Sequence, residues 1–276
     1  MADETSPPTT RAVDLVIEIK SSPEAVWKAI TEPDELIRWF SPEASGEAKE
    51  GGHVTVSWGG GSAWKSNIVV WKPGVHLGLQ DELNQPVEEQ GAVVALDYFI
   101  ETKDGSTVVR LVNSGFSADD EWDDFFHMVT NGWTFFLWNL KHYLERHPGT
   151  PRTMMPVRPW VSGTRDEVWA KVFGDEGLGD GAPASGQAFA FDLGSEVLEG
   201  VVVLSDRPWA FAGQVHSLDD GVIHIELEGS GDRWKLGVWL AAYGVDQDSC
   251  DRARSALASR IAGLFPQDEA KPETQS

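Results

Sequence analysis

Residues 21–31 read SSPEAVWKAIT, and residues 163–173 read GTRDEVWAKVF. When the two are aligned, EAVW at 24–27 falls on DEVW at 166–169, and two later pairs of stretches follow in the same order. They are WKPGVHLGLQ (71–80) with DRPWAFAGQ (206–214), and GSTVVRLVNSGFSADDEWD (105–123) with GDRWKLGVWLAAYGVDQDSCD (231–251). An internal repeat whose period exceeds about a hundred residues indicates two related domains rather than a solenoid.

The repeat predicts a first domain at residues 11–149 and a shortened second domain at 150–265. Polar, proline-containing tails at 1–10 and 266–276 flank them, and we expect both tails to be disordered. The second copy has shorter connections and lacks a clear counterpart of the short helix at 33–40. We therefore expect the second domain to enclose a smaller cavity than the first, or none.

Residues 11–20 of the first domain alternate as a strand, and Ser22-Pro23-Glu24 is typical of a helix start. A long helix is predicted from about Asp119 to His147, with one broad apolar stripe. Between them, runs bounded by glycine or proline predict strands at 44–50, 53–58, 63–72, 75–82, 92–101 and 106–116. This order is an α+β layout in which a curved antiparallel sheet wraps around the long helix and leaves a cavity.

The second domain repeats the layout in a smaller form. A strand is predicted near 153–161, a helix at 164–173 and a last helix from Asp246 to about Leu264. The strands between these helices are expected near 186–193, 196–205, 208–216, 222–229 and 233–243.

The composition excludes several classes of function. With 44 acidic and 22 basic residues, the formal charge is −22, which argues against binding to nucleic acid or anionic membranes. The single cysteine, Cys250, excludes an internal disulfide and a cysteine-based zinc site. No apolar run reaches the length of a membrane span, and MADETSPPTTR at the N-terminus lacks an apolar signal core. The expected location is the cytoplasm.

Four stretches carry a resemblance to a known family. They are SSPEAVWKAITEPDELIRWFSPE (21–43), VVWKPGVHLGLQDE (69–82), GSTVVRLVNSGF (105–116) and HMVTNGWTFFLWNLKHYLE (127–145). In these the first domain resembles the START-like (SRPBCC) superfamily and, within it, homologues of the activator of heat-shock protein 90 ATPase. The second domain is similar more weakly, through DEVWAKVF and DRPWAFAG.

The resemblance implies a helix-grip fold, present twice, with a deep and mostly apolar ligand cavity in the first copy. It implies no single activity, because the superfamily contains lipid and hormone carriers, polyketide cyclases and co-chaperone modules.

The candidate site is this cavity. On the strand 106–116, Val109, Leu111 and Asn113 share one face if the pleat is regular, and the resemblance turns that face toward the long helix. Asn113 lies near the position where many relatives carry His, and an amide can orient a ligand but cannot titrate. It either bonds to neighbouring backbone or holds a polar group of the ligand.

Large side chains are expected around Asn113, where each one either fills the core or lines the cavity: Trp39, Phe40, Trp58, Trp64, Phe126, Val129 and Trp133. Asp97 and Tyr98 are neighbours on one strand, so at most one of them faces the cavity. If Asp97 faced inward, its carboxyl would have a raised pKa and could act as a base.

The sequence contains no phosphate-binding loop, dinucleotide fingerprint or nucleophile elbow, and its histidines lack the spacing of metal ligands. We therefore assign no catalytic residue and expect neither a metal nor a cofactor. The first hypothesis is a module that binds a small hydrophobic or aromatic ligand in the first domain. The alternatives are a cyclase- or hydratase-like enzyme, and a co-chaperone-type module that contacts a chaperone or forms a homodimer.

Overall fold

The chain divides into two units, Met1–Gly149 and Thr150–Ser276. The computed structural model describes residues 10–59, 63–81, 94–179, 182–231 and 233–266. The tails expected to be disordered lie outside these ranges, except that Thr10 begins the first strand and residue 266 follows the last helix.

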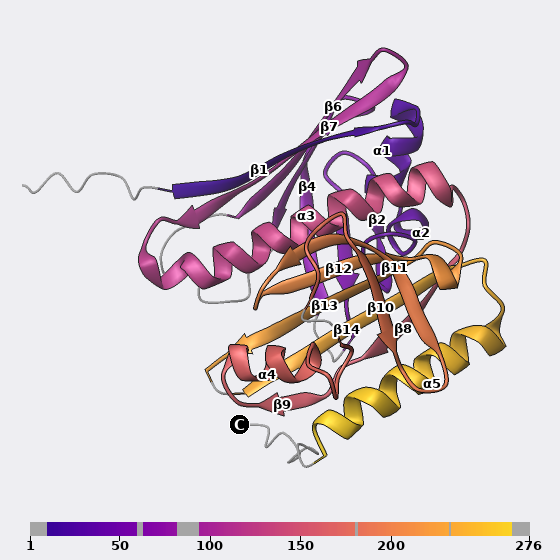
Figure 1. Cartoon of the computed structure of the whole chain (residues 1–276). Coiled ribbons are helices and arrows are strands. Elements are labelled where there is room, and N and C mark those ends of the chain that lie inside the picture. The colour runs from indigo at the N-terminus through magenta and orange to yellow at the C-terminus, as the bar shows by residue number, and fades with distance from the viewer. Residues whose placement is uncertain (1–9, 60–62, 82–93, 180–181, 232, 267–276) are drawn as a thin grey trace, which may run out of the picture. The chain divides into compact units, whose positions relative to one another are not determined.

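The first unit is one antiparallel sheet with helices on one of its faces (Figure 1). Its helices are α1 (Pro23–Thr31), α2 (Pro33–Leu36), the short 3₁₀ helix η2 (Asp120–Trp122) and α3 (Asp123–Arg146). Its strands are β1 (Thr10–Ile19), β2 (Glu43–Glu47), β3 (His53–Ser57), β4 (Ala63–Lys72), β5 (His76–Asp81), β6 (Ala95–Lys103) and β7 (Ser106–Ser117). The strand order is β1-β7-β6-β5-β4-β3-β2, so the first strand joins the last and the others form a meander.

Local chemistry sets the ends of the helices. Ser22 caps α1, because its Oγ accepts the N–H of Ala25 at 3.2 Å, and Pro23 takes the first helical position. The long helix starts later than the predicted Asp119. The Oγ of Ser117 accepts the Asp119 N–H at 3.2 Å and donates to the Asp119 carboxylate at 2.7 Å. This local turn competes with the helix, so regular α3 begins only at Asp123.

The C-terminal half of α3 is fixed to the helical segment after β1. The Nδ2 of Asn139 donates to the carbonyl of Trp39, and the indole N–H of Trp39 donates to the carbonyl of Ala29 at 2.8 Å. Farther along, the hydroxyl of Tyr143 donates to Glu35 at 2.5 Å. Trp39 and Asn139 are fully buried, so these bonds are shielded from water.

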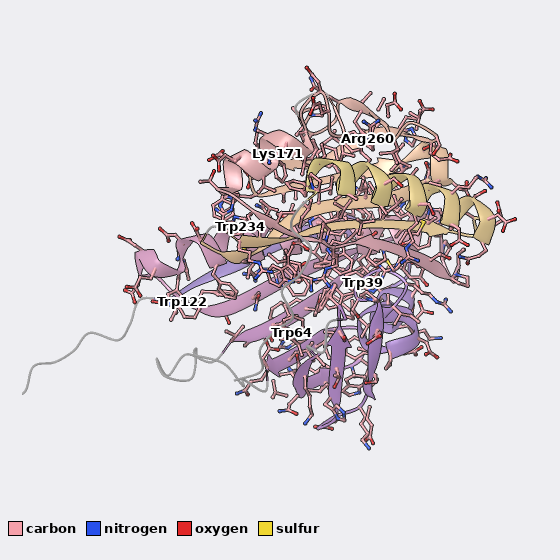
Figure 2. The ribbon with its side chains drawn as sticks, turned by 90° about the horizontal axis from the view of Figure 1, so that it is seen from below. Trp39, Trp64, Trp122, Lys171, Trp234 and Arg260 are labelled. Atoms are coloured by element: carbon pink, nitrogen blue, oxygen red, sulfur yellow. The ribbon has the colours of Figure 1, made fainter. Side chains whose placement is uncertain are left out.

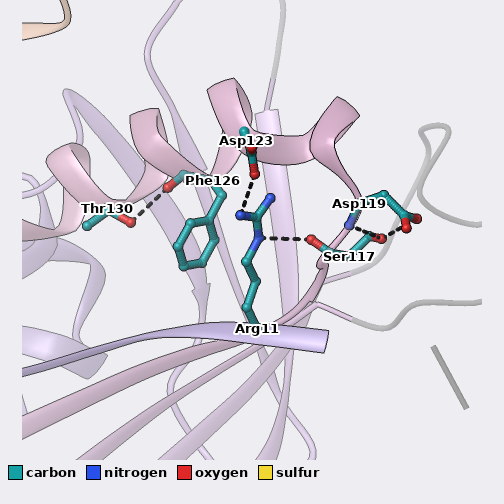
Figure 3. A network of polar contacts seen from close by, with 6 residues as sticks. All are labelled: Arg11, Ser117, Asp119, Asp123, Phe126 and Thr130. Carbon is teal, nitrogen blue, oxygen red and sulfur yellow. Dashed lines mark hydrogen bonds and ion pairs between the residues drawn. The ribbon is translucent and has the colours of Figure 1, made fainter. Parts of the chain in front are cut away.

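The N-terminal half of α3 is fixed to the sheet by Arg11 of β1 (Figure 3). Its Nε donates to the carbonyl of Ser117 at 2.9 Å, and another guanidinium nitrogen lies 2.6 Å from the carboxylate of Asp123. The guanidinium also stacks over the ring of Phe126, 4.5 Å from its centroid. One side chain therefore joins β1, the end of β7 and the first turn of α3.

A β-bulge at Gly115 changes the inward face of β7. Ser114 pairs with Ala12 and Phe116 pairs with Arg11, which leaves Gly115 unpaired with φ +96°. Regular alternation would place Phe116 on the face opposite Asn113; the extra residue turns both toward α3.

We expect alanine substitutions at two glycines of this unit to have opposite effects. Gly115→Ala should destabilise the protein by about 1–2 kcal/mol, because a side chain is strained at positive φ. Gly132→Ala should stabilise it by about 0.5–1 kcal/mol, because Gly132 is inside α3. Among the described residues, a Cβ there would meet only Phe136, at 4.0 Å. Denaturant unfolding measures both, and a stabilising Gly115→Ala would contradict the bulge.

The second unit has the same layout. Its helices are α4 (Arg165–Val172), the short 3₁₀ helix η3 (His216–Leu218) and α5 (Gln247–Leu264). Its strands are β8 (Arg152–Val157), β9 (Trp160–Ser162), β10 (Ala188–Asp192), β11 (Val197–Asp206), β12 (Ala210–Val215), β13 (Gly221–Ser230) and β14 (Arg233–Tyr243). The order is β10-β11-β12-β13-β14-β8, and β9 also pairs with β14.

The strands β8 and β9 together take the place that β1 has in the first unit, beside the last strand. An α-helix follows them, and the long helix α5 ends the unit and lies along the sheet (Figure 1). The predicted α+β, helix-grip fold in two copies is confirmed. No helix in the described ranges is long and apolar enough to cross a membrane.

The core of the second unit is rich in aromatic rings. The ring of Phe173 lies 4.7 Å from Trp169 and 5.2 Å from Phe211, and Phe189 lies 4.7 Å from Phe191. All five side chains are buried. Whether this unit also contains a small cavity stays a prediction.

Candidate ligand cavity

A cavity of about 770 Å³ lies in the first unit, between the sheet and the helices. Its walls come from α1, α2, the strands β3 to β7, η2 and the N-terminal half of α3. Aromatic side chains are the largest group in the lining: Phe40, Trp58, Trp64, Tyr98, Phe116, Trp122, Phe125, Trp133 and Phe136. The volume lies within the range of about 300–1,000 Å³ that is usual for small-molecule pockets.

The rings hold one another in place. Phe40 stacks on Trp133 with centroids 5.5 Å apart, and it meets Phe136 and Trp58 edge to face at 4.7 and 5.1 Å. These are favourable aromatic geometries. Trp64, packed against Trp58 at 5.4 Å, is 53% exposed and therefore lies where the cavity meets solvent.

The predicted site residues fall into two groups. Those on the cavity wall are Phe40, Trp58, Trp64, Asn113, Val129 and Trp133. Those outside the wall are Trp39, Val109, Leu111 and Phe126. Contact with a ligand stays a prediction for both groups.

Trp39, Val109 and Leu111 lie in solid core instead. All three are 0% exposed. The indole N–H of Trp39 is bonded to backbone, and its ring lies behind Phe40 at 5.2 Å; Figure 2 shows it inside the unit, with Trp64 and Trp122 nearer the edge. Val109 and Leu111 do share the buried face of β7 with Asn113, but neither lines the cavity, although Leu111 pairs with Tyr98, which does.

Phe126 lies beside the cavity wall, and its neighbour Phe125 lines the cavity. Successive helical residues are turned by about 100°, so one position decides which of the two rings faces inward. Phe126 packs on Phe116 and Arg11, whereas Phe125 is on the helix face of Trp122, Val129 and Gly132. The apolar stripe of α3 is broad enough to allow either position, so the sequence pattern could not choose.

Asn113 is already bonded on both sides of its amide. Its Nδ2 donates to the carbonyl of Ala95 at 2.9 Å, and its Oδ1 accepts the indole N–H of Trp133 at 2.9 Å. This geometry favours the interpretation that Asn113 bonds to its neighbours. Its direct effect is to fix the orientation of Trp133, which is part of the cavity wall.

Residues 20–145 match a protein family described as "Activator of Hsp90 ATPase homolog 1-like protein". This segment of the chain belongs to that family. The resemblance inferred from residues 21–145 is thereby confirmed, and the match runs from just after β1 almost to the end of α3, which includes the residues that line the cavity. A comparison with curated proteins finds no match.

Several solved structures are similar to the chain. The Aha1 dimer from Colwellia psychrerythraea is 26% identical, with a TM-score of 0.44, over 50% of this chain and 99% of that protein. CalU16 from Micromonospora echinospora is 19% identical, with a TM-score of 0.39, over 49% and 77%. DynU16, from the dynemicin biosynthetic locus, is 16% identical, with a TM-score of 0.42, over 92% and 97%.

Two carboxylates in the family segment line the cavity and were missed from the sequence, Asp81 and Glu121. Asp81 ends β5, and its Oδ1 accepts a hydrogen bond from the Ser66 hydroxyl at 2.6 Å. Burial raises the pKa of Asp81, and the bond from Ser66 opposes that shift. The signal was available, because Asp81 continues the inward alternation of Leu77 and Leu79.

Asp97 has the opposite orientation. It lies 2.7 Å from the Nε2 of His76 and does not line the cavity, whereas Tyr98 does. The two residues therefore alternate as expected, and the inward carboxylate comes from β5 and not from β6.

Gly132 also lines the cavity and was missed. A glycine in the interior of a long helix costs about 1 kcal/mol relative to alanine. At this position the absent side chain leaves room in the cavity. An interior helical glycine on the apolar stripe is therefore the signal that could have marked the site.

Among the described residues, no group of three His, Cys, Asp or Glu side chains is arranged to hold a metal ion.

The hydroxyl of Tyr98 is unusual in this segment. Tyr98 is 3% exposed and lines the cavity, and among the described residues its hydroxyl has no hydrogen-bond partner. Burial raises the pKa of Tyr98, so the phenol stays protonated at neutral pH. It is a neutral donor and acceptor that faces the cavity.

We expect Tyr98→Phe and Tyr143→Phe to differ in stability. Tyr98→Phe should change the free energy of unfolding by less than about 0.5 kcal/mol, since the hydroxyl has no hydrogen bond to lose among the described residues. Tyr143→Phe should cost about 2 kcal/mol, because that hydroxyl donates to Glu35 and accepts from Arg38 and the Gly149 N–H. Urea unfolding of both variants makes the comparison. An equal loss would mean that the Tyr98 hydroxyl has a protein partner.

Proposed function

We propose that the first unit binds a small hydrophobic ligand with aromatic character in its cavity. The observation that carries the proposal is a cavity of about 770 Å³ walled mainly by aromatic and aliphatic side chains. A ligand that removes this apolar surface from water gains about 25 cal/mol for each Å² buried. The residues proposed to contact it include Phe40, Trp58, Trp64 and Trp133.

Two details support a ligand rather than loose packing. The first is Gly132, which leaves space on a helix where almost any side chain would be more favourable. The second is the Tyr98 hydroxyl, a buried polar group that a ligand could pair. Few polar groups in a largely apolar wall are typical of small-molecule sites. In this proposal the ligand site belongs to the first unit, and the second unit is a structural companion.

An enzymatic role of the cyclase or hydratase kind is the second candidate. That hypothesis requires a titratable group inside the cavity, and Asp81 is such a group. It would be supported if a ligand were converted by the wild type and only bound by Asp81→Asn.

A chaperone contact or a homodimer is the third candidate. It is favoured by the family description, which names an activator of the Hsp90 ATPase, and by the dimer of the Colwellia protein. Enrichment of a chaperone with the full-length chain, and not with an unrelated acidic protein, would support it.

The ligand proposal is tested with Nile red, a neutral dye that brightens in apolar surroundings. We expect the dye to bind the wild type and Gly132→Ala with similar affinity. Gly132→Leu should weaken binding by at least about tenfold, because the larger side chain projects into the cavity.

The pair Gly132→Ala and Gly132→Leu is matched, since both remove the helical glycine and only one fills the cavity. Unfolding curves show whether both variants are folded. The proposal is overturned if Nile red shows no binding to the wild type, or if Gly132→Leu binds the dye as well as Gly132→Ala does.

A further inference from the structure

The charged groups on the cavity wall have one sign. Asp81 and Glu121 line it, and no Lys, Arg or His is among the lining residues, all of which belong to the described part of the chain. An apolar cavity with two carboxylates and no basic group does not suit an anionic ligand. The formal charge of −22 on the whole chain acts in the same direction, because it steers cations toward the protein.

Both carboxylates lie at the same end of the cavity. Asp81 is the last residue of β5, and its backbone N–H points to the carbonyl of Val94, 3.4 Å away. Glu121 is in η2, which follows the end of β7 at Ser117. In this antiparallel sheet, the end of β5, the approach to β6 and the end of β7 lie side by side.

Aromatic rings lie next to Asp81. Ser66, which bonds to Asp81, is two residues from Trp64 on the same face of β4, and both line the cavity. Trp58 packs against Trp64 at 5.4 Å. An indole face attracts a cation by its quadrupole, and a carboxylate attracts it by its charge.

A separate observation indicates that the cavity is built for a ligand with polar groups. The Tyr98 hydroxyl, nine-tenths or more buried, faces the cavity without a partner among the described residues. Tyr98 on β6 is four residues after Val94, whose carbonyl faces the N–H of Asp81. Tyr98 therefore lies about 13 Å along the sheet from the end that holds Asp81 and Glu121.

From these contacts we propose that the ligand is a hydrophobic amine, protonated and held at the Asp81 end of the cavity, with its ring-containing body against the aromatic walls. This inference rests on the proposed function and specifies its ligand class. Ser66 orients Asp81, Trp64 and Trp58 flank the ammonium group, and Glu121 adds a second negative charge at the same end. In amines long enough to reach it, the Tyr98 hydroxyl forms a hydrogen bond with a polar atom at the end of the ligand opposite the ammonium group.

Asp81→Asn is a suitable variant. Ser66 can still donate to the amide oxygen, so the local hydrogen bond is kept. Burial raises the pKa of Asp81, because the charged carboxylate is less stable in the folded protein than in water. The neutral amide of Asn does not carry this desolvation cost at neutral pH. We expect Asp81→Asn to be at least as stable as the wild type.

The experiment compares three probes with the same aromatic body: naphthylmethylammonium, naphthylmethanol and naphthoate. Titration calorimetry at neutral pH measures each with the wild type, Asp81→Asn and Glu101→Gln. The last is the charge-matched control, since Glu101 is exposed and lies outside the cavity lining. The ammonium should bind the wild type at least about tenfold more tightly than naphthoate, as expected for a partly buried charged pair.

Asp81→Asn should weaken the binding of naphthylmethylammonium by about tenfold. The affinity for naphthylmethanol should change by less than about twofold, because the alcohol carries no charge. Glu101→Gln should leave all three affinities unchanged. If naphthoate binds as tightly as the ammonium, or if Asp81→Asn weakens the alcohol as much as the amine, the inference is overturned and the hydrophobic cavity stands. If none of the probes binds the wild type, and Nile red does not bind either, the proposed function fails together with the inference.

Discussion

The hydrogen bond from Asn139 to the carbonyl of Trp39 fixes the long helix against the segment that follows the first strand. Both partners are buried, so breaking the bond would leave polar groups without water, at a cost of about 1–3 kcal/mol. At the other end of α3, Arg11 joins the helix to the sheet. The cavity lies along the N-terminal half of a helix that is held at both ends, so the space is kept open by contacts outside it.

Most of the fold could be predicted because its signals are local. Alternating apolar residues give the strands within a few positions, and Ser22 and Asp246 cap α1 and α5 as their residue types suggest. The start of α3 and the bulge at Gly115 were not predictable in the same way. The start of α3 depends on the bond between Asp119 and Ser117, and the bulge depends on how β7 pairs with β1. The pattern of apolar and polar residues does not determine either set of hydrogen bonds.

The site was predicted in outline and not in detail. Trp58, Trp64 and Trp133 were expected near the cavity, because in this α+β layout large aromatic side chains either fill the core or line the cavity. Phe126 was expected there and Phe125 was found there, since a broad apolar stripe does not define the helix rotation to within one residue. Asp81 lines the cavity and was not predicted, whereas Asp97, the carboxylate on the neighbouring strand, pairs with His76 on the other face of the sheet.

The cavity of the first unit has a mechanical consequence. Pressure favours whichever state of a protein has the smaller volume, and unfolding eliminates internal voids. A cavity of about 770 Å³ therefore makes the first unit sensitive to hydrostatic pressure, and a bound molecule that occupied the space would make it less compressible. The volume change of unfolding thus depends on whether the cavity is filled, whatever the chemistry of the molecule that fills it.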